Sequence, residues 1–372
     1  MEKFKTIYDN RHQYAKEWKL RTGGKVIGYF CTYIPEEILY AANILPVRIL
    51  GSHEPQSVTE PHIFAMFCPF CRDCLAQGLQ GRYDYLDGIM IAQSCLHIRQ
   101  AYTSWDLHIP MDYSYYLPMP NNVQSKHSYP YLRSELVEFK KSIEKWTGKP
   151  ITDADLDKGI EIMNTNRRLM RQVYETRKDD NSPISGLEAM YMVVSGQMAD
   201  KTEHSNWIKE ALALPVRKRD TGVRLMAIGS ENDDTKFIDM VEGCGATFVI
   251  DDHCTGSRYF WNEVKASPSD RLLAIAERYI DRPACPSKDW PERRRIGHIL
   301  QLAKDYRAQG AILLQQKFCD PHELDIPAIR KALESSGLPT ITLELDVTVP
   351  IGQFKTRVEA FLEEMLLEEE LF

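Results

Sequence analysis

Short apolar runs alternate with amphipathic stretches along the first 125 residues. Residues 35–42 open with a proline and two glutamates, which suit the first turn of a helix. Residues 72–79 also have a helical pattern. The apolar runs have the length and composition of strands and cover residues 25–31, 46–50, 88–92 and 109–116. Strands and helices in alternation predict a parallel α/β unit.

The pattern changes in the middle of the chain and then returns. Residues 131–212 have long helical periodicity with many charges, and Asp153 or Asp155 is expected to cap the middle helix. Strand-like runs resume at residues 223–228, 246–250, 310–315 and 340–345, with helical stretches between them. We therefore predict an α/β fold of two parallel-sheet (Rossmann/flavodoxin-like) domains with a helical insert. The expected bounds are 1–125, 126–215 and 216–372.

Composition narrows the class of protein. The 372 residues are 43% hydrophobic and 27% charged, which is an ordinary globular balance. The net charge of −7 argues against nucleic acid as a partner, since phosphate binding favours a basic surface. No apolar run is long enough for a membrane helix, and the polar start MEKFKTIYDN lacks the apolar core of a secretory signal. We expect a cytoplasmic protein with no membrane partner, in which the nine cysteines are reduced thiols, ligands or nucleophiles.

Three cysteines carry the main chemical signal. Cys68 lies in MFCPFCRDC, Cys95 in AQSCLHI and Cys319 in QKFCDP. Cys95 and Cys319 each follow a strand-like run, and functional groups collect outside the carboxyl ends of strands in an open parallel sheet. Soft thiolates gathered there suit an iron–sulfur cluster or zinc. The alternative is that the thiols are only packed in the core.

The segment around Cys68 resembles part of a ferredoxin ligand run. Cys68, Cys71 and Cys74 are spaced by two residues each, but the fourth Cys-Pro of that run does not follow. On a helix, Cys68 and Cys71 share a face while Cys74 turns away. The spacing is compatible with metal binding and equally with packed thiols.

The other sequence features give weaker signals. Cys31, Cys244, Cys254 and Cys285 remain, and among them Cys254 beside His253 is a minor candidate for zinc binding or nucleophilic attack. We expect Cys254→Ser to leave any iron content unchanged. The basic triplets at 217–219 and 293–295 are expected either to meet a phosphate or to be solvated. Neither a GxxxxGK[ST] loop nor a GxGxxG motif occurs, so any nucleotide would be bound by another protein.

Several long segments together resemble a known family. They are KVIGYFCTYIPEEILYAANILPVRILG, the Cys68 segment, DYLDGIMIAQSC, GAILLQQKFCDPHELDIPAIRKALESSGLPTITLELD and the closing GQFKTRVEAFLEEM. In this order they are similar to the benzoyl-CoA reductase/2-hydroxyacyl-CoA dehydratase family over nearly the whole chain. The resemblance implies one [4Fe–4S] cluster between two α/β domains, held by Cys68, Cys95 and Cys319. Cys71 is a possible fourth ligand, and Cys74 would be only a packed neighbour.

The resemblance also implies a function. The length and the MFCPFCRDC and AQSCLHIRQ segments are most similar to the smaller cluster-bearing subunit, of the N or C type, of ATP-dependent benzoyl-CoA reductases. Such an oxidoreductase subunit passes low-potential electrons for the dearomatisation of benzoyl-CoA in anaerobic aromatic degradation. The alternatives are the β subunit of a 2-hydroxyacyl-CoA dehydratase and a non-catalytic zinc- or cluster-binding protein. The implied partners are a larger homologous subunit, an ATP-hydrolysing iron–sulfur activator fed by ferredoxin, and an acyl-CoA substrate.

Overall fold

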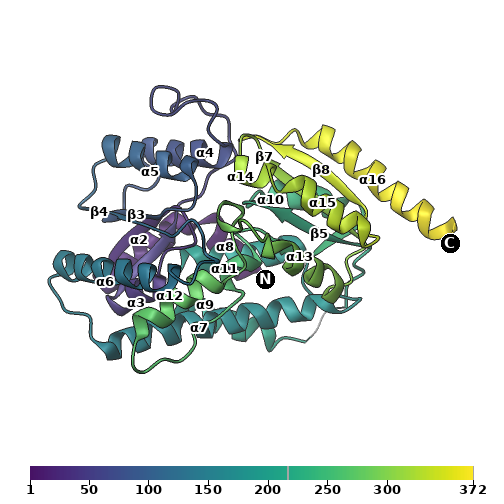
Figure 1. The fold of residues 1–372 in the computed structure, drawn as a ribbon. Coiled ribbons are helices and arrows are strands. Elements are labelled where there is room, and N and C mark those ends of the chain that lie inside the picture. Colours follow the sequence, from purple (N-terminus) through teal and green to yellow (C-terminus); the bar gives the residue numbers. More distant parts are fainter. Residues whose placement is uncertain (216–217, 372) are drawn as a thin grey trace.

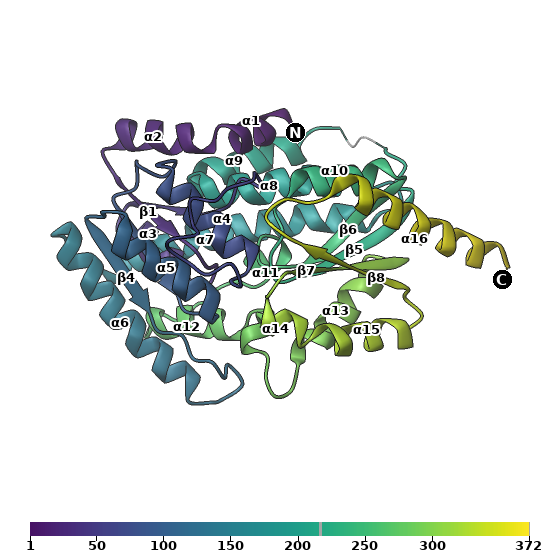
Figure 2. The same cartoon turned by 90° about the horizontal axis from the view of Figure 1, so that it is seen from above.

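Two four-stranded parallel sheets form the framework of the protein (Figures 1 and 2). The structure is a computed structural model that describes residues 1–215 and 218–371. The first sheet has the order β2–β1–β3–β4, with β1 (Lys25–Tyr29), β2 (Ile44–Arg48), β3 (Gly88–Ala92) and β4 (Tyr113–Leu117). The second has the order β6–β5–β7–β8, with β5 (Val223–Gly229), β6 (Ala246–Asp252), β7 (Gly310–Gln316) and β8 (Thr340–Leu345). The predicted α/β class with two parallel sheets is confirmed.

Each sheet has a point where the strand order reverses. The chain pairs β1 with β2 on one side and with β3 on the other, in parallel register in both cases. The second sheet repeats this arrangement, with β5 between β6 and β7. Such reversals open a crevice outside the carboxyl ends of the central strands, where ligands bind in open α/β sheets. Cavity-lining side chains are therefore expected after β1, β3, β5 and β7.

The helices of the first 212 residues cover the first sheet and make up the middle region of the chain. They are α1 (Glu2–Asp9), α2 (Arg11–Thr22), α3 (Glu36–Ala41), α4 (Pro69–Leu79), α5 (Leu96–His108), α6 (Ser128–Thr147), α7 (Asp153–Glu175), α8 (Gly186–Met198) and α9 (Lys201–Leu212). The N-cap of α7 is Thr152 rather than Asp153, whereas Asp155 takes part in capping the helix, as predicted, through a capping box with Thr152. None of the described helices is both long enough and apolar enough to cross a membrane.

The remaining helices surround the second sheet, with one exception. They are α10 (Thr235–Gly243), α11 (Ser257–Phe260), α12 (Arg271–Asp281), α13 (Arg294–Asp305), α14 (Asp320–Glu323), α15 (Ile326–Ser335) and α16 (Ile351–Leu371). The exception is α12, which lies beside α6 and α7 (Figures 1 and 2). Its Ile275 and Tyr279 share one apolar core with Ile27 of β1 and Met90 of β3. The chain thus returns from the second sheet to pack against the first.

Buried ion pairs fix α3, the helix that follows β1, in this arrangement. Glu37 pairs with Arg167 of α7 at 2.6 Å and accepts a hydrogen bond from Tyr279 of α12 at 3.0 Å. Glu36 accepts a hydrogen bond from Tyr259 of α11 at 2.6 Å. All these side chains are buried, so each charge depends on its partner. The segment between β1 and α3, which carries Cys31, is held from several sides.

Candidate functional site

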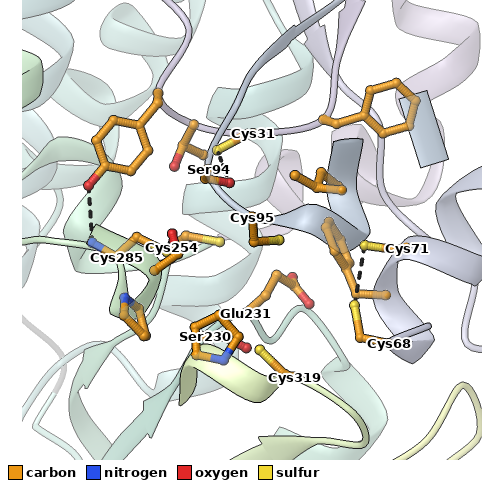
Figure 3. Close-up of a pocket in the computed structure, with 18 of the residues that line it drawn as sticks. Cys31, Cys68, Cys71, Ser94, Cys95, Ser230, Glu231, Cys254, Cys285 and Cys319 are labelled. Carbon is orange, nitrogen blue, oxygen red and sulfur yellow. Dashed lines mark hydrogen bonds between the residues drawn. The ribbon is translucent and has the colours of Figure 1, made fainter. Parts of the chain in front are cut away.

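Seven of the nine cysteines line one cavity. Its volume of about 80 Å³ is several times what one water molecule needs. The predicted ligands Cys68, Cys95 and Cys319 all line this cavity, and so does Cys71. The other three are Cys31, Cys254 and Cys285. Figure 3 shows Cys95 near the middle, with Cys68 and Cys71 on one side and Cys254 and Cys285 on the other.

Each predicted ligand precedes a helix. Cys68 is the N-cap of α4, which begins at Pro69 because proline suits the first helical position; the expected start at residue 72 was too late. Cys95 follows β3 and is the N-cap of α5, a helix that the sequence pattern did not predict. Cys319 follows β7 and precedes the short α14. The positive end of α4 favours a thiolate at Cys68.

Cys68 has the environment of a reactive thiolate. Its sulfur lies 3.2 Å from the Cys71 sulfur, and its backbone N–H donates to His97 Nδ1 at 3.1 Å. The hydrogen bond with Cys71, together with the neighbouring His97, lowers the pKa of the Cys68 thiol despite its burial. Burial raises the pKa of Cys71 instead. Of these two hydrogen-bonded sulfurs, Cys68 is therefore the one that more readily becomes a thiolate.

Cys95 and Cys319 are held as neutral thiols by their surroundings. Burial raises the pKa of Cys95 well above its usual range, and the nearby sulfurs of Cys68 and Cys319 raise it further. Burial likewise raises the pKa of Cys319 to about 12, with a further contribution from Cys68. Thiolates are the metal-binding form, so a metal entering this cavity would have to displace protons from both.

The donors fit a cluster better than a single ion. Among the described residues, no three His, Cys, Asp or Glu side chains converge closely enough to hold one metal ion. In an iron–sulfur cluster each cysteine binds a separate iron, so the ligand sulfurs stand apart around an open space. Three cysteines from different elements around one cavity have this character. The arrangement does not favour the tetrahedral single-ion site expected for zinc.

The cavity wall also contains a buried carboxyl group that was not predicted from the sequence. Glu231 follows β5, and only 3% of its surface is exposed. Its Oε1 accepts a hydrogen bond from Thr255 at 2.6 Å, whereas its Oε2 has no partner among the described residues. Burial raises the pKa of Glu231 to about 8. Its position just after a strand was the signal available in the sequence.

The polar motifs outside the cavity are mostly structural. Asp252, the last residue of β6, forms buried ion pairs with Arg258 and Arg295 at 3.2 and 2.6 Å. Arg295 is therefore committed to a carboxylate rather than free for a phosphate. Arg294 pairs with Glu292 at the surface. In the other basic triplet, position 217 lies outside the described residues.

A wider cleft leads to the cavity from the surface. It has a volume of about 720 Å³ and shares Ser94, Cys95, Pro286, Ser287 and Pro321 with the cavity wall. Its apolar lining residues Leu96, Trp290 and Leu324 are exposed by 55%, 67% and 71%. Large apolar side chains exposed together around an opening mark a surface that another molecule covers.

Comparison with known proteins identifies the family of the chain. The (R)-phenyllactyl-CoA dehydratase beta subunit of Clostridium sporogenes is 29% identical, over 97% of both chains. One of the subunits of the benzoyl-CoA reductase of Thauera aromatica is 28% identical, over 89% of this chain and 88% of that one. The beta subunit of (R)-2-hydroxyglutaryl-CoA dehydratase from Acidaminococcus fermentans is 26% identical, over 98% of both. Residues 31–365 match the family model described as 2-hydroxyglutaryl-CoA dehydratase, D-component, so the chain belongs to this family.

Proposed function

We propose that the chain is an iron–sulfur subunit of an acyl-CoA-converting complex, with a [4Fe–4S] cluster on Cys68, Cys95 and Cys319. One observation carries the proposal: three cysteines from both sheets line a single cavity at the carboxyl ends of the strands. The bound cluster would supply single electrons at low potential, within the roughly −700 to +450 mV that such centres span.

The residues around the three cysteines suit a low-potential centre. Phe30, Phe70 and Ile98 line the cavity and limit the access of water. Cys71 lies within hydrogen-bond distance of the Cys68 sulfur, and hydrogen bonds to ligand sulfurs tune the potential. Cys71 also stays the candidate for a fourth ligand. Cys71→Ala separates the two roles, because loss of a donor shifts the midpoint potential, whereas loss of a ligand lowers the iron content or changes the cluster spectrum.

The mouth of the cavity suits a partner subunit. The relatives named above are subunits of larger enzymes. We propose that a larger homologous subunit buries the exposed Leu96, Trp290 and Leu324, and that an ATP-hydrolysing iron–sulfur protein delivers the electrons. The external donor has an energetic reason, since an ordinary ferredoxin near −400 mV lies hundreds of millivolts above the most negative cluster potentials.

For the substrate we propose benzoyl-CoA, with a 2-hydroxyacyl-CoA as the alternative. Relatives of both kinds are almost equally similar to the chain. The cleft that leads to the cavity carries Asp289, Asp320 and Asp325 beside Arg293. This acidic lining repels the phosphates of CoA, so we place the CoA head on the partner subunit. The isolated chain should therefore bind CoA only weakly.

The ligand assignment is tested by iron analysis of the anaerobically purified protein. Cys319→Ser should remove most of the cluster that this cysteine holds, while both sheets keep their apolar cores and the far-UV circular dichroism is retained. Cys244→Ser is the matched control, because its thiol donates to the Met240 carbonyl and it is not among the cavity-lining residues. Normal iron content and an unchanged cluster spectrum in Cys319→Ser would refute the assignment.

The substrate is tested with the reconstituted complex. The chain, its partner subunit and the ATP-dependent donor are supplied with benzoyl-CoA or with an (R)-2-hydroxyacyl-CoA. Formation of a cyclic diene-carboxyl-CoA supports the reductase, and formation of an enoyl-CoA supports the dehydratase. The chain with dithionite and benzoyl-CoA alone should form neither product; steady turnover there would contradict the division of labour.

A further inference from the structure

The cavity contains a second set of cysteines that the proposed cluster does not use. Cys31 follows β1, Cys254 follows β6, and Cys285 immediately precedes the short 3-10 turn Pro286–Lys288. All three line the cavity together with Cys68, Cys95 and Cys319. The second set therefore also combines segments from both sheets, because Cys31 and Cys254 lie just after β1 and β6, as Cys95 and Cys319 lie after β3 and β7.

The members of the second set lie near one another and near the first set. Burial raises the pKa of the Cys31 thiol, and the neighbouring thiols of Cys285 and Cys254 raise it further. Cys285 also contributes to the raised pKa values of Cys95 and Cys319. All six cysteines line the same cavity, and Figure 3 shows Cys95 between the Cys68–Cys71 side and the Cys254–Cys285 side, so the two sets occupy neighbouring parts of one cavity.

Buried positive charge surrounds the second set. Arg48 and Arg282 line the cavity and are almost fully buried, yet among the described residues neither has a carboxylate within 4.0 Å. Arg48 instead donates to the Cys254 sulfur at 3.1 Å, and the Nε of each arginine has no hydrogen-bond partner among the described residues. An arginine is always charged, and a buried charge without a counter-ion is costly. The cavity is therefore suited to hold an anion.

We propose that Cys31, Cys254 and Cys285 hold a second iron–sulfur cluster beside the first, so that each copy of the protein holds two clusters in one cavity. A thiolate-ligated cluster is negatively charged and would therefore neutralise the buried charges of Arg48 and Arg282. This inference rests on the proposed function, and it reverses the expectation that Cys254 has no influence on iron content. As a consequence, one chain could store two electrons in the same cavity, one on each cluster.

Iron stoichiometry tests this directly. The anaerobically purified chain, together with its partner subunit where the two copurify, is analysed for iron and acid-labile sulfide per chain after the partner's content is subtracted. Two clusters predict about eight irons per chain and one cluster about four. Cys285→Ser should lower the iron content of the chain about twofold and leave the first set intact, whereas Cys244→Ser should leave the content unchanged.

Electron paramagnetic resonance gives an independent readout. Two reduced clusters in one cavity should show magnetic interaction, and Cys285→Ser should convert this into the signal of one isolated cluster. About four irons in the wild-type chain, with a spectrum that Cys285→Ser does not alter, would overturn the second cluster and leave the first in place. A chain without iron in any variant would overturn both proposals. The wild-type stoichiometry decides the question even if Cys285→Ser fails to fold.

Discussion

Gly159 of α7 gives a sharp test of how α3 is held beside the cavity. A Cβ atom added there would lie 2.1 Å from the backbone oxygen of Glu37, whereas ordinary contact begins at 3.4 Å. Helix α3 would have to retreat by about 1.3 Å, and the obstacle is backbone rather than a flexible side chain. Overpacking of this kind costs about 1–3 kcal/mol. We expect Gly159→Ala to destabilise the protein by that amount.

Gly297→Ala is the matched control for this substitution. Gly297 is exposed within α13, and an added Cβ would meet nothing within 4 Å. Alanine should therefore stabilise that helix by about 0.5–1 kcal/mol. Both substitutions reduce the freedom of the unfolded chain in the same way, so the difference between them isolates the contact with Glu37. Urea unfolding followed by circular dichroism measures both. A Gly159→Ala protein as stable as the wild type would refute the close packing of α3 against α7.

Three further predictions follow from buried groups. Asp233 lies 2.7 Å from His53 and raises the pKa of His53 to about 10, although burial acts in the opposite direction. The pair therefore contributes its whole stabilisation below about pH 6.5, and the free energy of unfolding falls by a few kcal/mol as the pH rises to 10. His53→Gln should flatten this part of a stability–pH profile; an unchanged slope would contradict the pairing. Glu37→Gln leaves the buried Arg167 without its counter-ion and should lower the free energy of unfolding by about 3–5 kcal/mol, measured by urea unfolding. A decrease below about 1 kcal/mol would show that this ion pair is not dominant. Cys74→Ala should leave iron content unchanged, because the Cys74 thiol donates to the Ile49 carbonyl instead of lining the cavity; lost iron would assign it to the site.

Most strands could be predicted because their residues are apolar, and in all of the described strands but β4 and β8 these residues are buried on both faces. The runs 88–92 and 340–345 match β3 and β8 at both ends, and the other strands differ only at their ends. Helices α5 and α12 escaped detection. In α5 the buried Ile98, Ala101 and Trp105 are interrupted by polar residues, and α12 packs against α6 and α7 rather than against the second sheet. Helix α12 belongs to the predicted C-terminal domain, 216–372, but packs against helices of the middle region. The predicted domain bounds therefore stay a prediction.

The candidate site was predictable in part for a similar physical reason. Cys95 and Cys319 stand out because a strand ends just before each of them, and the structure places both at the cavity with Cys68. The same rule applied to Cys254, whereas the expected strand 25–31 included Cys31, and only the structure shows that β1 ends at Tyr29, before this cysteine. Cys285 follows no strand at all. Cys285 reaches the cavity because α12, just before it, brings the chain back to the first sheet. No local sequence pattern predicts this return.

The geometry of the two sheets explains why so many cysteines meet. Each sheet reverses its strand order at a central strand, and each reversal directs chain segments from neighbouring strands toward one crevice. Where two such crevices face each other, the ends of β1 and β3 meet those of β6 and β7, and a cysteine lies shortly after each of these four strands. A single cluster on Cys68, Cys95 and Cys319 leaves Cys31, Cys254 and Cys285 unused beside Arg48 and Arg282, and neither arginine has a carboxylate within 4.0 Å among the described residues. Two adjacent clusters would use six of the cavity's cysteines as ligands and would provide counter-ions for both arginines. We therefore regard the second set as part of the same electron-carrying site.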